Sequence, residues 1–543
     1  METSLRLRVI TIILFLQFLT LPTLHTNFCT GESTAEVRCI ESERVALLRF
    51  KQDLQDPSHR LASWATGDGD CCQWVGVVCH NVTGHVRELF LRSFPLVYDD
   101  VFMSGDELRT QMKAYWSSRF GGKINPSLLD LKHLIYLDLS YNNFYGTQIP
   151  KFLGSMERLR YLNLSGAGFG GVIPHQLGNL SNLHYLNLGG YNNNLYVMNL
   201  QWLSGLPLLQ HLDMSHVNLS QASDWLPDIN KLPSLLELRL SNCYLSGSTP
   251  STPSINFSSL ATLDLSYNHF ENTSNILWVF GLHNLVSLDL SGNQFQGPIP
   301  VDLQNMTSLR HLDLSYNAFN SSIPNWLYSF SRLEFLNLDS NSLQGTISSS
   351  IENLTSAISI DLSYNELGGK GKVRGVFHHS STGKIIDLSK NNLSGEIPKE
   401  VTSLQGLQSL NLSFNSLNGR IPENIGDMGS LESIDFSVNQ LSGQVPQTLS
   451  YRASTASSFV GNELCGPPLA NNCTINYVKP NTENERSKDF GGLEVDWFYV
   501  SMALGFVVGF WVVWGPLLMN KHWRFLYFQF LDRLGNKLRG VVS

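Results

Sequence analysis

The chain has 543 residues, of which 37 are Lys or Arg and 45 are Asp or Glu, so its formal net charge at pH 7 is −8. This mild acidity excludes a general nucleic-acid binder. Composition indicates no narrower class, and the positions of the residues have to supply it.

The N-terminus has the features of a secretory signal peptide, which we place at residues 1–26. Arg6 and Arg8 precede an apolar stretch over 9–21 that is too short to span a bilayer easily. Cleavage is expected between residues 23 and 30, where no clean small-x-small pattern fixes the position. An uncleaved membrane anchor is the alternative interpretation.

Residues 39–88 are predicted to cap one end of the fold that follows. Apolar residues at helical spacing run through 45–54, and Trp64 and Trp74 can cover an open core. Six of the eight cysteines flank the central region, namely Cys39, Cys71, Cys72 and Cys79 before it and Cys465 and Cys473 after it. In an oxidising compartment these predict two N-terminal disulfides and one C-terminal disulfide, with the pairing left open. Cys29 is left over.

Residues 89–446 repeat one short pattern. A Leu-x-Leu pair, or an Ile-x-Leu or similar variant, returns every 24 to 26 residues from 137 to 436, and Leu89 to Leu91 adds an earlier copy. This period is the signature of a leucine-rich-repeat solenoid, an α/β fold whose repeats cannot bury their apolar faces alone. We expect about 14 strands, an irregular insertion over 92–122, and a long concave surface suited to binding rather than catalysis.

A conserved turn residue within the chain's own repeats predicts an internal hydrogen-bond ladder. In the repeat at 285–308, Leu288 and Leu290 point inward, and Asn293 follows where the chain must turn. The same Asn recurs at Asn142, Asn268, Asn317, Asn341, Asn365, Asn391, Asn415 and Asn439. Four consecutive repeats replace it with Ala167, Tyr191, Val217 and Cys243, and we interpret Cys243 as a buried structural thiol.

The C-terminal part predicts a type I, single-pass membrane protein. A second cap over 447–473 and an acidic spacer over 474–496 precede 497–519, which holds no charge for 23 residues and can cross a bilayer. Basic residues in the tail, 520–543, place that tail in the cytoplasm. The tail has no room for a kinase, and its Tyr527–Phe530 segment fits an endocytic signal or an interfacial anchor. Ser501, Gly505 and Gly509 form a small-xxx-small face for helix packing.

Twelve Asn-x-Ser/Thr sequons predict a glycosylated ectodomain. They are Asn81, Asn163, Asn179, Asn218, Asn256, Asn272, Asn305, Asn320, Asn353, Asn392, Asn411 and Asn472.

Aromatic and histidine side chains beside the strands are the candidate ligand contacts, because they combine a large contact area with a polar group. The principal candidates are Tyr136, Tyr161, Tyr185, His211, Tyr267, His311, Tyr316 and Phe335, and further ones are Tyr141, His216, Tyr364 and Phe414. The recurring Asp within the strands is interpreted as framework. No catalytic constellation, metal site or cofactor is predicted.

Several segments together resemble plant leucine-rich-repeat receptor-like proteins related to the ethylene-inducing xylanase receptors. They are the cap over 39–91, PSLLDLKHLIYLDLSYNNF at 126–144, the strings at 159–188 and 457–469, GFVVGFW in the membrane segment, and Gly-x-Ile-Pro elements such as 297–300. The resemblance implies a curved plant-type superhelix with an outer second sheet. It also implies the disulfides Cys39–Cys71, Cys72–Cys79 and Cys465–Cys473.

In function, the resemblance implies a plasma-membrane receptor for an extracellular peptide, protein or elicitor, acting in defence or development through a partner receptor-like kinase. The chain differs from the family by having about half the expected repeats, only a vestigial island at 366–384, and an abrupt junction before the C-terminal cap. A non-signalling decoy, adhesion scaffold or wall-enzyme inhibitor is therefore the alternative function.

Overall fold

The computed structural model describes residues 38–473, except 66, 68, 94–104, 192–193, 248–255, 371–384, 405, 451–454 and 471–472. The predicted signal peptide, spacer, membrane segment and tail lie outside the described residues, as do Asn472, Ser501, Gly505 and Gly509 and most of the vestigial island. Within the described part of the chain, no helix has both the length and the hydrophobicity needed to cross a membrane.

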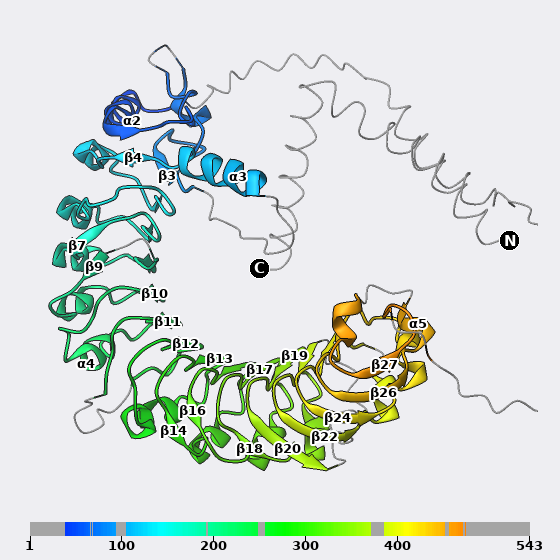
Figure 1. Ribbon diagram of the computed structural model, residues 1–543. Helices are drawn as coiled ribbons and strands as arrows, with labels where there is room; N and C mark the ends of the chain where they lie inside the picture. The colour runs from blue at the N-terminus through cyan, green and yellow to red at the C-terminus, as the bar shows by residue number, and fades with distance from the viewer. Residues whose placement is uncertain are drawn as a thin grey trace, which may run out of the picture. The chain divides into compact units, whose positions relative to one another are not determined.

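A sheet of 15 strands follows the inner side of a curved solenoid (Figure 1). Strand β2 pairs antiparallel with β3, and the other 14 run parallel, one for each Leu-x-Leu pair or variant. In order, the strands are Val77–Cys79 (β2), Val86–Phe90 (β3), Tyr136–Asp138 (β5), Tyr161–Asn163 (β6), Tyr185–Asn187 (β8), His211–Asp213 (β10), Glu237–Arg239 (β11), Thr262–Asp264 (β12), Ser287–Asp289 (β13), His311–Asp313 (β15), Phe335–Asn337 (β17), Ser359–Asp361 (β19), Ile385–Asp387 (β21), Ser409–Asn411 (β23) and Ser433–Asp435 (β25).

A second layer of short strands lies on the outer side, as the family resemblance implies (Figure 1). The longest outer sheet contains Gln344–Gly345 (β18), Glu366–Lys370 (β20), Asn392–Glu396 (β22), Ser416–Gly419 (β24), Gln440–Gln444 (β26) and Glu463–Cys465 (β27). Two-stranded pieces pair Gly170–Val172 (β7) with Asn194–Tyr196 (β9) and Gln296–Gly297 (β14) with Ala318–Phe319 (β16).

Short 3-10 helices, rather than the α-helices of an α/β fold, form most of the helical backbone of the repeats. They are Pro126–Asp130 (η2), Lys151–Ser155 (η3), His175–Asn179 (η4), Gln201–Gly205 (η5), Thr273–Gly281 (η6), Val301–Asn305 (η7), Asn325–Ser329 (η8), Ser349–Asn353 (η9), Lys399–Ser403 (η11) and Glu423–Asp427 (η12). Two short α-helices, Trp225–Ile229 (α4) and Gln447–Ser450 (α5), also occur. The tight 3-10 turn fits because few residues are available to return the chain between sheets.

The predicted Asn ladder is confirmed. Asn293 donates from Nδ2 to the carbonyl oxygens of Leu290 and of Leu265 in the preceding repeat, both at 3.1 Å. Its Oδ1 accepts from the Phe270 amide at 3.2 Å. Cys243 occupies the same place, where its buried thiol lies 3.2 Å from the Met214 carbonyl oxygen. Burial raises the pKa of this thiol, which fits the structural role predicted for it.

The N-terminal cap closes one end of the core. Helix Glu41–Asp53 (α2) buries Ala46, Leu47 and Phe50, and the rings of Trp64 and Trp74 stack with centroids 5.5 Å apart. A short 3-10 helix, Cys71–Gln73 (η1), brings the four cysteines together. The structure joins Cys39 to Cys71 and Cys72 to Cys79, which is the pairing that the resemblance implied.

The prediction of an irregular insertion over 92–122 is wrong in part. Residues Gly105–Ser117 form a 13-residue α-helix, α3, and Gly121–Gly122 (β4) then pairs with Leu54–Gln55 (β1) of the cap. The helix lies on the inner side of the curve (Figure 1). Its sequence, GDELRTQMKAYWS, lacks the Leu-x-Leu pattern but holds many good helix formers, so local propensity decides the structure.

The C-terminal cap continues the repeats without a break, contrary to the abrupt junction expected from the sequence. The Val438 amide donates a hydrogen bond to the Val460 carbonyl oxygen, and β27 pairs with β26 in the outer sheet. Asn462 extends the Asn ladder by donating to the carbonyl oxygens of Phe436 and Phe459 at 2.9 and 3.1 Å. The segment Ala456–Phe459 (η13) and the disulfide Cys465–Cys473 complete the cap.

Candidate ligand-binding face

A row of stacked aromatic rings crosses the inner sheet near its N-terminal end. The parallel register aligns Tyr136, Tyr161, Tyr185 and His211, the first residues of β5, β6, β8 and β10. Neighbouring tyrosine rings lie 4.0 and 4.2 Å apart at interplanar angles of 8° and 10°. We call these four residues the aromatic row. Because strands lie about 4.8 Å apart, identical residues at one register position meet face to face.

Partial burial controls the chemistry of this row. Burial raises the pKa of Tyr136 and Tyr161, and it raises the pKa of Tyr185 to about 12. The phenols therefore remain neutral at physiological pH and can donate or accept hydrogen bonds. Asn163 and Asn187 donate to the hydroxyl oxygens of Tyr161 and Tyr185, at 3.3 and 3.4 Å. The row thus offers apolar ring area with polar edges, which suits contact with peptide or protein surfaces.

A cluster of ionisable side chains, His211, Glu237 and Arg239, lies at the end of the aromatic row. His211 Nδ1 lies 2.8 Å from Glu237 Oε2, and Arg239 Nε lies 2.5 Å from Glu237 Oε1. Burial opposes ionisation, but the hydrogen bonds from His211 and Arg239 lower the pKa of Glu237. These side chains and Tyr185 surround a pocket of about 210 Å³. It can distinguish ligand groups by charge at a place where the tyrosines cannot.

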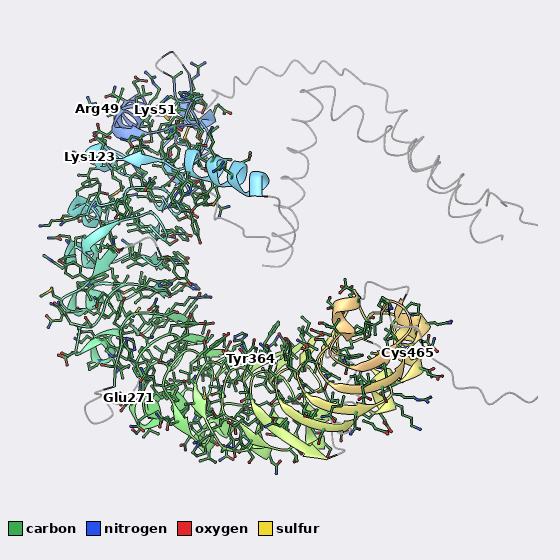
Figure 2. All side chains as sticks on the ribbon, in the orientation of Figure 1. Arg49, Lys51, Lys123, Glu271, Tyr364 and Cys465 are labelled. Atoms are coloured by element: carbon green, nitrogen blue, oxygen red, sulfur yellow. A yellow bond between two sulfur atoms is a disulfide. The ribbon has the colours of Figure 1, made fainter. Side chains whose placement is uncertain are left out.

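A second row of side chains lies at the other end of the strands, on residues that precede the ladder position. Its aromatic and histidine members all have a left-handed backbone, and all except His216 are more than a third exposed. One of them, Tyr364, is seen on the inner side of the curve in Figure 2. They are Tyr141, His216, Tyr267, Tyr316, Tyr364 and Phe414. We call this set the turn row. A left-handed backbone is costly for bulky residues, and the repeat imposes it because the chain turns sharply toward the buried Asn.

The eight principal candidates therefore do not form one cluster. Tyr136, Tyr161, Tyr185 and His211 are continuous, whereas Tyr267 and Tyr316 belong to the turn row. His311 and Phe335 occupy the register of the aromatic row, with ring centroids 5.8 Å apart, but Thr262 and Ser287 lie between them and the cluster of ionisable side chains. The N-terminal half of the inner face thus holds the more concentrated set of candidate ligand contacts.

Helix α3 adds a site that sequence reasoning missed. Met112, Tyr115 and Trp116 of the helix form one wall of a pocket of about 550 Å³, and Tyr191 and His216 form another. The rings of Tyr191 and His216 lie 3.9 Å apart. Tyr191 occupies a ladder position in sequence, but its side chain is 88% exposed. The pocket therefore lies where the ladder is interrupted.

Two glycines keep this pocket open. In their own repeats, Gly166 and Gly190 stand at the position that the turn-row residues hold in others. Their φ angles are 61° and 131°, and both line the pocket. A Cβ on Gly190 would lie 2.6 Å from the Gly166 backbone nitrogen, and one on Gly166 would lie 3.1 Å from the Tyr141 ring. Side chains at these positions would fill the floor. The interrupted ladder and these glycines were the available sequence signal, but only the fold places them opposite α3.

A buried guanidinium holds α3 against the sheet. Arg119 is 3% exposed and donates to the carbonyl oxygens of Tyr141 at 2.8 Å, Gly166 at 2.7 Å, and Asn142. The guanidinium also lies 5.1 Å from the ring centroids of Tyr115 and Trp116. Burial lowers the pKa of Arg119, whose ordinary value is high enough that it stays charged.

Two of the predicted glycosylation sites are less exposed than the others and stay predictions. Asn163 is buried and Asn411 is half-buried; Oδ1 of each accepts a hydrogen bond, from Ser165 and Ser413 respectively. Both lie within the inner sheet, where a glycan would displace the neighbouring rows. Nine others have exposed side chains and stay predicted sites: Asn81, Asn179, Asn218, Asn256, Asn272, Asn305, Asn320, Asn353 and Asn392.

Comparison with known proteins agrees with this architecture. The leucine rich repeat N-terminal domain model matches residues 40–80. Leucine rich repeat models match residues 133–156, 158–180, 234–254, 284–306, 300–343, 384–404 and 406–428.

Two curated proteins of Solanum lycopersicum are similar in sequence. Receptor-like protein EIX1 is 38% identical over 309 residues, and receptor-like protein EIX2 is 37% identical over 299 residues. These alignments cover 56% and 54% of this chain but only 28% of either relative. The matched region thus spans little more than a quarter of those proteins.

Two solved structures share the fold. The crystal structure of PEPR1–AtPEP1 is 27% identical, has a TM-score of 0.51, and covers 78% of this chain and 62% of its own. The crystal structure of a TDR receptor is also 27% identical and has a TM-score of 0.51. The match covers 61% of this chain and 56% of the TDR chain.

Proposed function

We propose that this chain, a plant leucine-rich-repeat protein similar to the receptor-like proteins of the ethylene-inducing xylanase receptor group, binds an extracellular peptide, protein or elicitor. The observation that carries the proposal is the continuous aromatic row beside the pocket under α3. Together they give a long apolar surface with polar edges and one recessed anchor site. Such a surface fits an extended or loop-shaped ligand better than a small metabolite.

The proposal includes a plasma-membrane location and a defence or developmental signal, with no enzymatic activity in the chain itself. Residues 497–519 would cross the membrane once, leaving the repeats outside and residues 520–543 in the cytoplasm. In this proposal the signal passes through a partner receptor-like kinase. The similarity to receptor-like proteins and to a receptor solved with AtPEP1 supports this proposal.

Variants of the aromatic row test ligand binding. We expect Tyr161→Ala combined with Tyr185→Ala to weaken capture of an active elicitor by at least 10-fold, because the substitution removes two stacked rings and their hydroxyl groups. Tyr145→Ala is the matched control, since Tyr145 is 74% exposed and follows the turn beyond the sheet. Equal capture by both variants would contradict binding at this face.

Variants of the predicted membrane segment test the kinase partnership. Gly505→Leu with Gly509→Leu should abolish co-precipitation with a partner receptor-like kinase, because leucine prevents close helix approach. Ala503→Leu with Val507→Leu changes the opposite face at the same spacing and should leave recovery unchanged. Recovery that survives the glycine substitutions would refute helix packing. Ligand capture without kinase association in the unsubstituted chain would favour the decoy function.

A further inference from the structure

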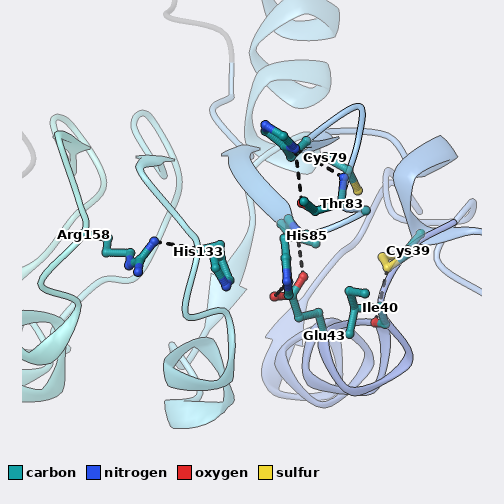
Figure 3. Close-up of polar contacts among 12 residues, drawn as sticks. Cys39, Ile40, Glu43, Cys79, Thr83, His85, His133 and Arg158 are labelled. Atoms are coloured by element: carbon teal, nitrogen blue, oxygen red, sulfur yellow. Dashed lines mark hydrogen bonds and ion pairs between the residues drawn. A yellow bond between two sulfur atoms is a disulfide. The ribbon is translucent and has the colours of Figure 1, made fainter. Parts of the chain in front are cut away.

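A basic pocket that the ligand-binding proposal does not use lies where the N-terminal cap meets the first repeats. It measures about 480 Å³ and is lined mainly by three histidines, three arginines, Thr83 and Asn182. Figure 3 shows part of this lining, including Thr83, His85, His133 and Arg158. The basic residues are His80, His85, His133, Arg87, Arg158 and Arg160. They come from the cap and the first two repeats after it, at the edge where the inner strands begin.

Hydrogen bonds and ring contacts fix the shape of this pocket. His85 Nδ1 lies 2.9 Å from Glu43 Oε1, and the rings of His85 and His133 stack with centroids 3.8 Å apart. Arg158 lies within 3.5 Å of His133 Nδ1, and the Thr83 hydroxyl lies 3.1 Å from His80 Nδ1. Figure 3 shows His85 and His133 facing each other between Glu43 and Arg158.

The positive charge in this pocket is not balanced by nearby acids. Glu43 is 3% exposed, and its two oxygens are already bonded to His85 and to the Val86 amide, at 2.9 and 2.7 Å. Among the described residues, no carboxylate oxygen lies within 4.0 Å of the guanidinium groups of Arg87, Arg158 or Arg160. Three guanidinium groups without acidic partners leave the pocket with a net positive charge.

We propose that this pocket binds a tetrahedral oxyanion, either sulfate or phosphate. Arginine guanidinium groups present paired N–H donors that match such oxygens, and histidine N–H groups add donors from the cap side. A planar carboxylate can be bound by a single guanidinium group. The donors here come from separate segments around the pocket, which suits a tetrahedral anion better. The volume also leaves room for a larger group that carries the anion.

The position of the pocket suggests how an anion reaches it. Ile135 and Arg160 line the pocket and directly precede Tyr136 and Tyr161 of the aromatic row. A sulfate or phosphate ester on a ligand lying across that row would therefore be close to the pocket. A free inorganic ion is the other source of the same chemistry. An aryl monoester and the inorganic ion distinguish these sources.

Binding should be coupled to protonation of His133. Burial, the neighbouring His85 and Arg158 lower the pKa of His133, while the more distant Glu43 opposes them and His80 adds to them. A bound anion adds a negative charge beside the ring and favours the imidazolium form. Sulfate stays fully charged above pH 5, so a change in its affinity reports the protein alone.

Isothermal titration of the purified full chain with sodium sulfate, sodium phosphate and phenyl phosphate, at constant ionic strength, tests the proposal. We expect sulfate to bind at least 3-fold more tightly at pH 5.5 than at pH 7.5. Arg158→Gln with Arg160→Gln should weaken all three ligands at least 10-fold. Arg310→Gln with Arg332→Gln is the matched control, because these arginines occupy the same two repeat positions outside the pocket.

The outcomes separate the sources and can overturn the proposal. Tighter binding of phenyl phosphate than of phosphate indicates an anion carried by a larger ligand, whereas equal binding indicates a free ion. His133→Asn should retain sulfate binding at pH 7.5 but reduce its pH dependence, with His80 and His85 still lining the pocket. The measurement is repeated after enzymatic removal of N-glycans, because the exposed sequon Asn81 adjoins the pocket. Absence of binding in both samples, or equal weakening in the matched control, would overturn the proposal.

Discussion

At the scale of single residues, the ladder asparagines replace backbone partners that a short strand cannot supply. Each inner strand has about three residues, so the carbonyl groups just beyond it need donors other than the strand backbone or in addition to it. Asn293 supplies donors to three of them, on Leu265, Leu290 and Ser291, each at 3.1 Å. Its Oδ1 is the acceptor for the buried Phe270 amide, and its Nδ2 shares the Leu265 and Leu290 carbonyl oxygens with the neighbouring asparagines Asn268 and Asn317.

Asn293→Ala should destabilise the chain by about 1–3 kcal/mol, because it leaves the buried Phe270 amide without its acceptor and removes one of the two ladder donors to the Leu265 and Leu290 carbonyl oxygens. The midpoint of urea unfolding measures this loss. Asn293→Cys should lose less, since Cys243 already contacts the Met214 carbonyl oxygen from the equivalent position. Equal losses in both variants would show that the amide contributes only through its volume.

A second residue-scale effect comes from three aligned aspartates. The register places Asp289 between Asp264 and Asp313, whereas Asp213 lies between Asn187 and Arg239. Burial, and then the two neighbouring carboxylates, raise the pKa of Asp289 to about 6, although hydrogen bonds from Ser291 oppose the shift. Its ordinary value is 3.8. The folded state therefore binds this proton more tightly than the unfolded state.

The direction in which folding stability changes with pH follows from the raised pKa of Asp289 in the folded state. The contribution of Asp289 to stability is fully present below about pH 4 and is lost as the pH rises through about 6. Asp289→Asn should therefore raise stability at pH 7.5, by on the order of 1–2 kcal/mol, and change it little at pH 4. Thermal unfolding at both pH values measures this difference. Asp213→Asn should give no gain, and a similar gain there would contradict the explanation.

At this scale the sequence predicted much of the site. The period aligned Tyr136, Tyr161 and Tyr185, because parallel strands of equal length keep one register. The prediction grouped Tyr267 and Tyr316 with them as aromatic residues beside a strand, although these two follow their Leu-x-Leu pair instead of preceding it. The period could not bring His80, His85 and His133 together with Arg158, because the contact depends on how the cap meets the first repeats.

At the scale of elements, α3 is the part whose position local sequence could not give. Its helical propensity was readable, but its docking depends on Arg119, which reaches carbonyl groups in two repeats that follow it. No repeat pattern encodes that contact. Such one-off elements are where periodic reasoning fails, and here the element forms a wall of a candidate pocket.

Arg119→Met should release α3 from the sheet. The substitution keeps the length of the side chain but removes the donors to Tyr141, Asn142 and Gly166, so their carbonyl groups lose a charged partner. We expect amide hydrogen exchange in Gly105–Ser117 to rise by at least 10-fold, with little change in β13 to β25. The exchange rate in Arg119→Lys should lie between those of the unsubstituted chain and of Arg119→Met, because one ammonium group cannot reach all three carbonyl oxygens. Unchanged exchange in the Met variant would show that ring packing alone holds α3.

At the scale of the whole molecule, stability is passed between neighbouring repeats rather than through one central core. The described repeats contact mainly the repeat before and the repeat after them, so each end needs a cap that covers exposed apolar residues and unpaired backbone groups. The Leu-x-Leu period predicted this architecture correctly. It did not reveal that the C-terminal cap continues the ladder, because Phe459 and Asn462 follow a segment without a Leu-x-Leu pair.

The continuity of that cap leads to a prediction about how far a defect spreads. Asn462→Ala removes the donors to Phe436 and Phe459 and the acceptor for the Leu441 amide. Because each repeat depends on its neighbour, we expect faster amide exchange in β25, β26 and β27 that decreases with distance and is absent from β5 and β6. Asn142→Ala should produce the reverse gradient from the N-terminal end. A uniform increase along the chain in either variant would mean that the solenoid unfolds as one cooperative unit.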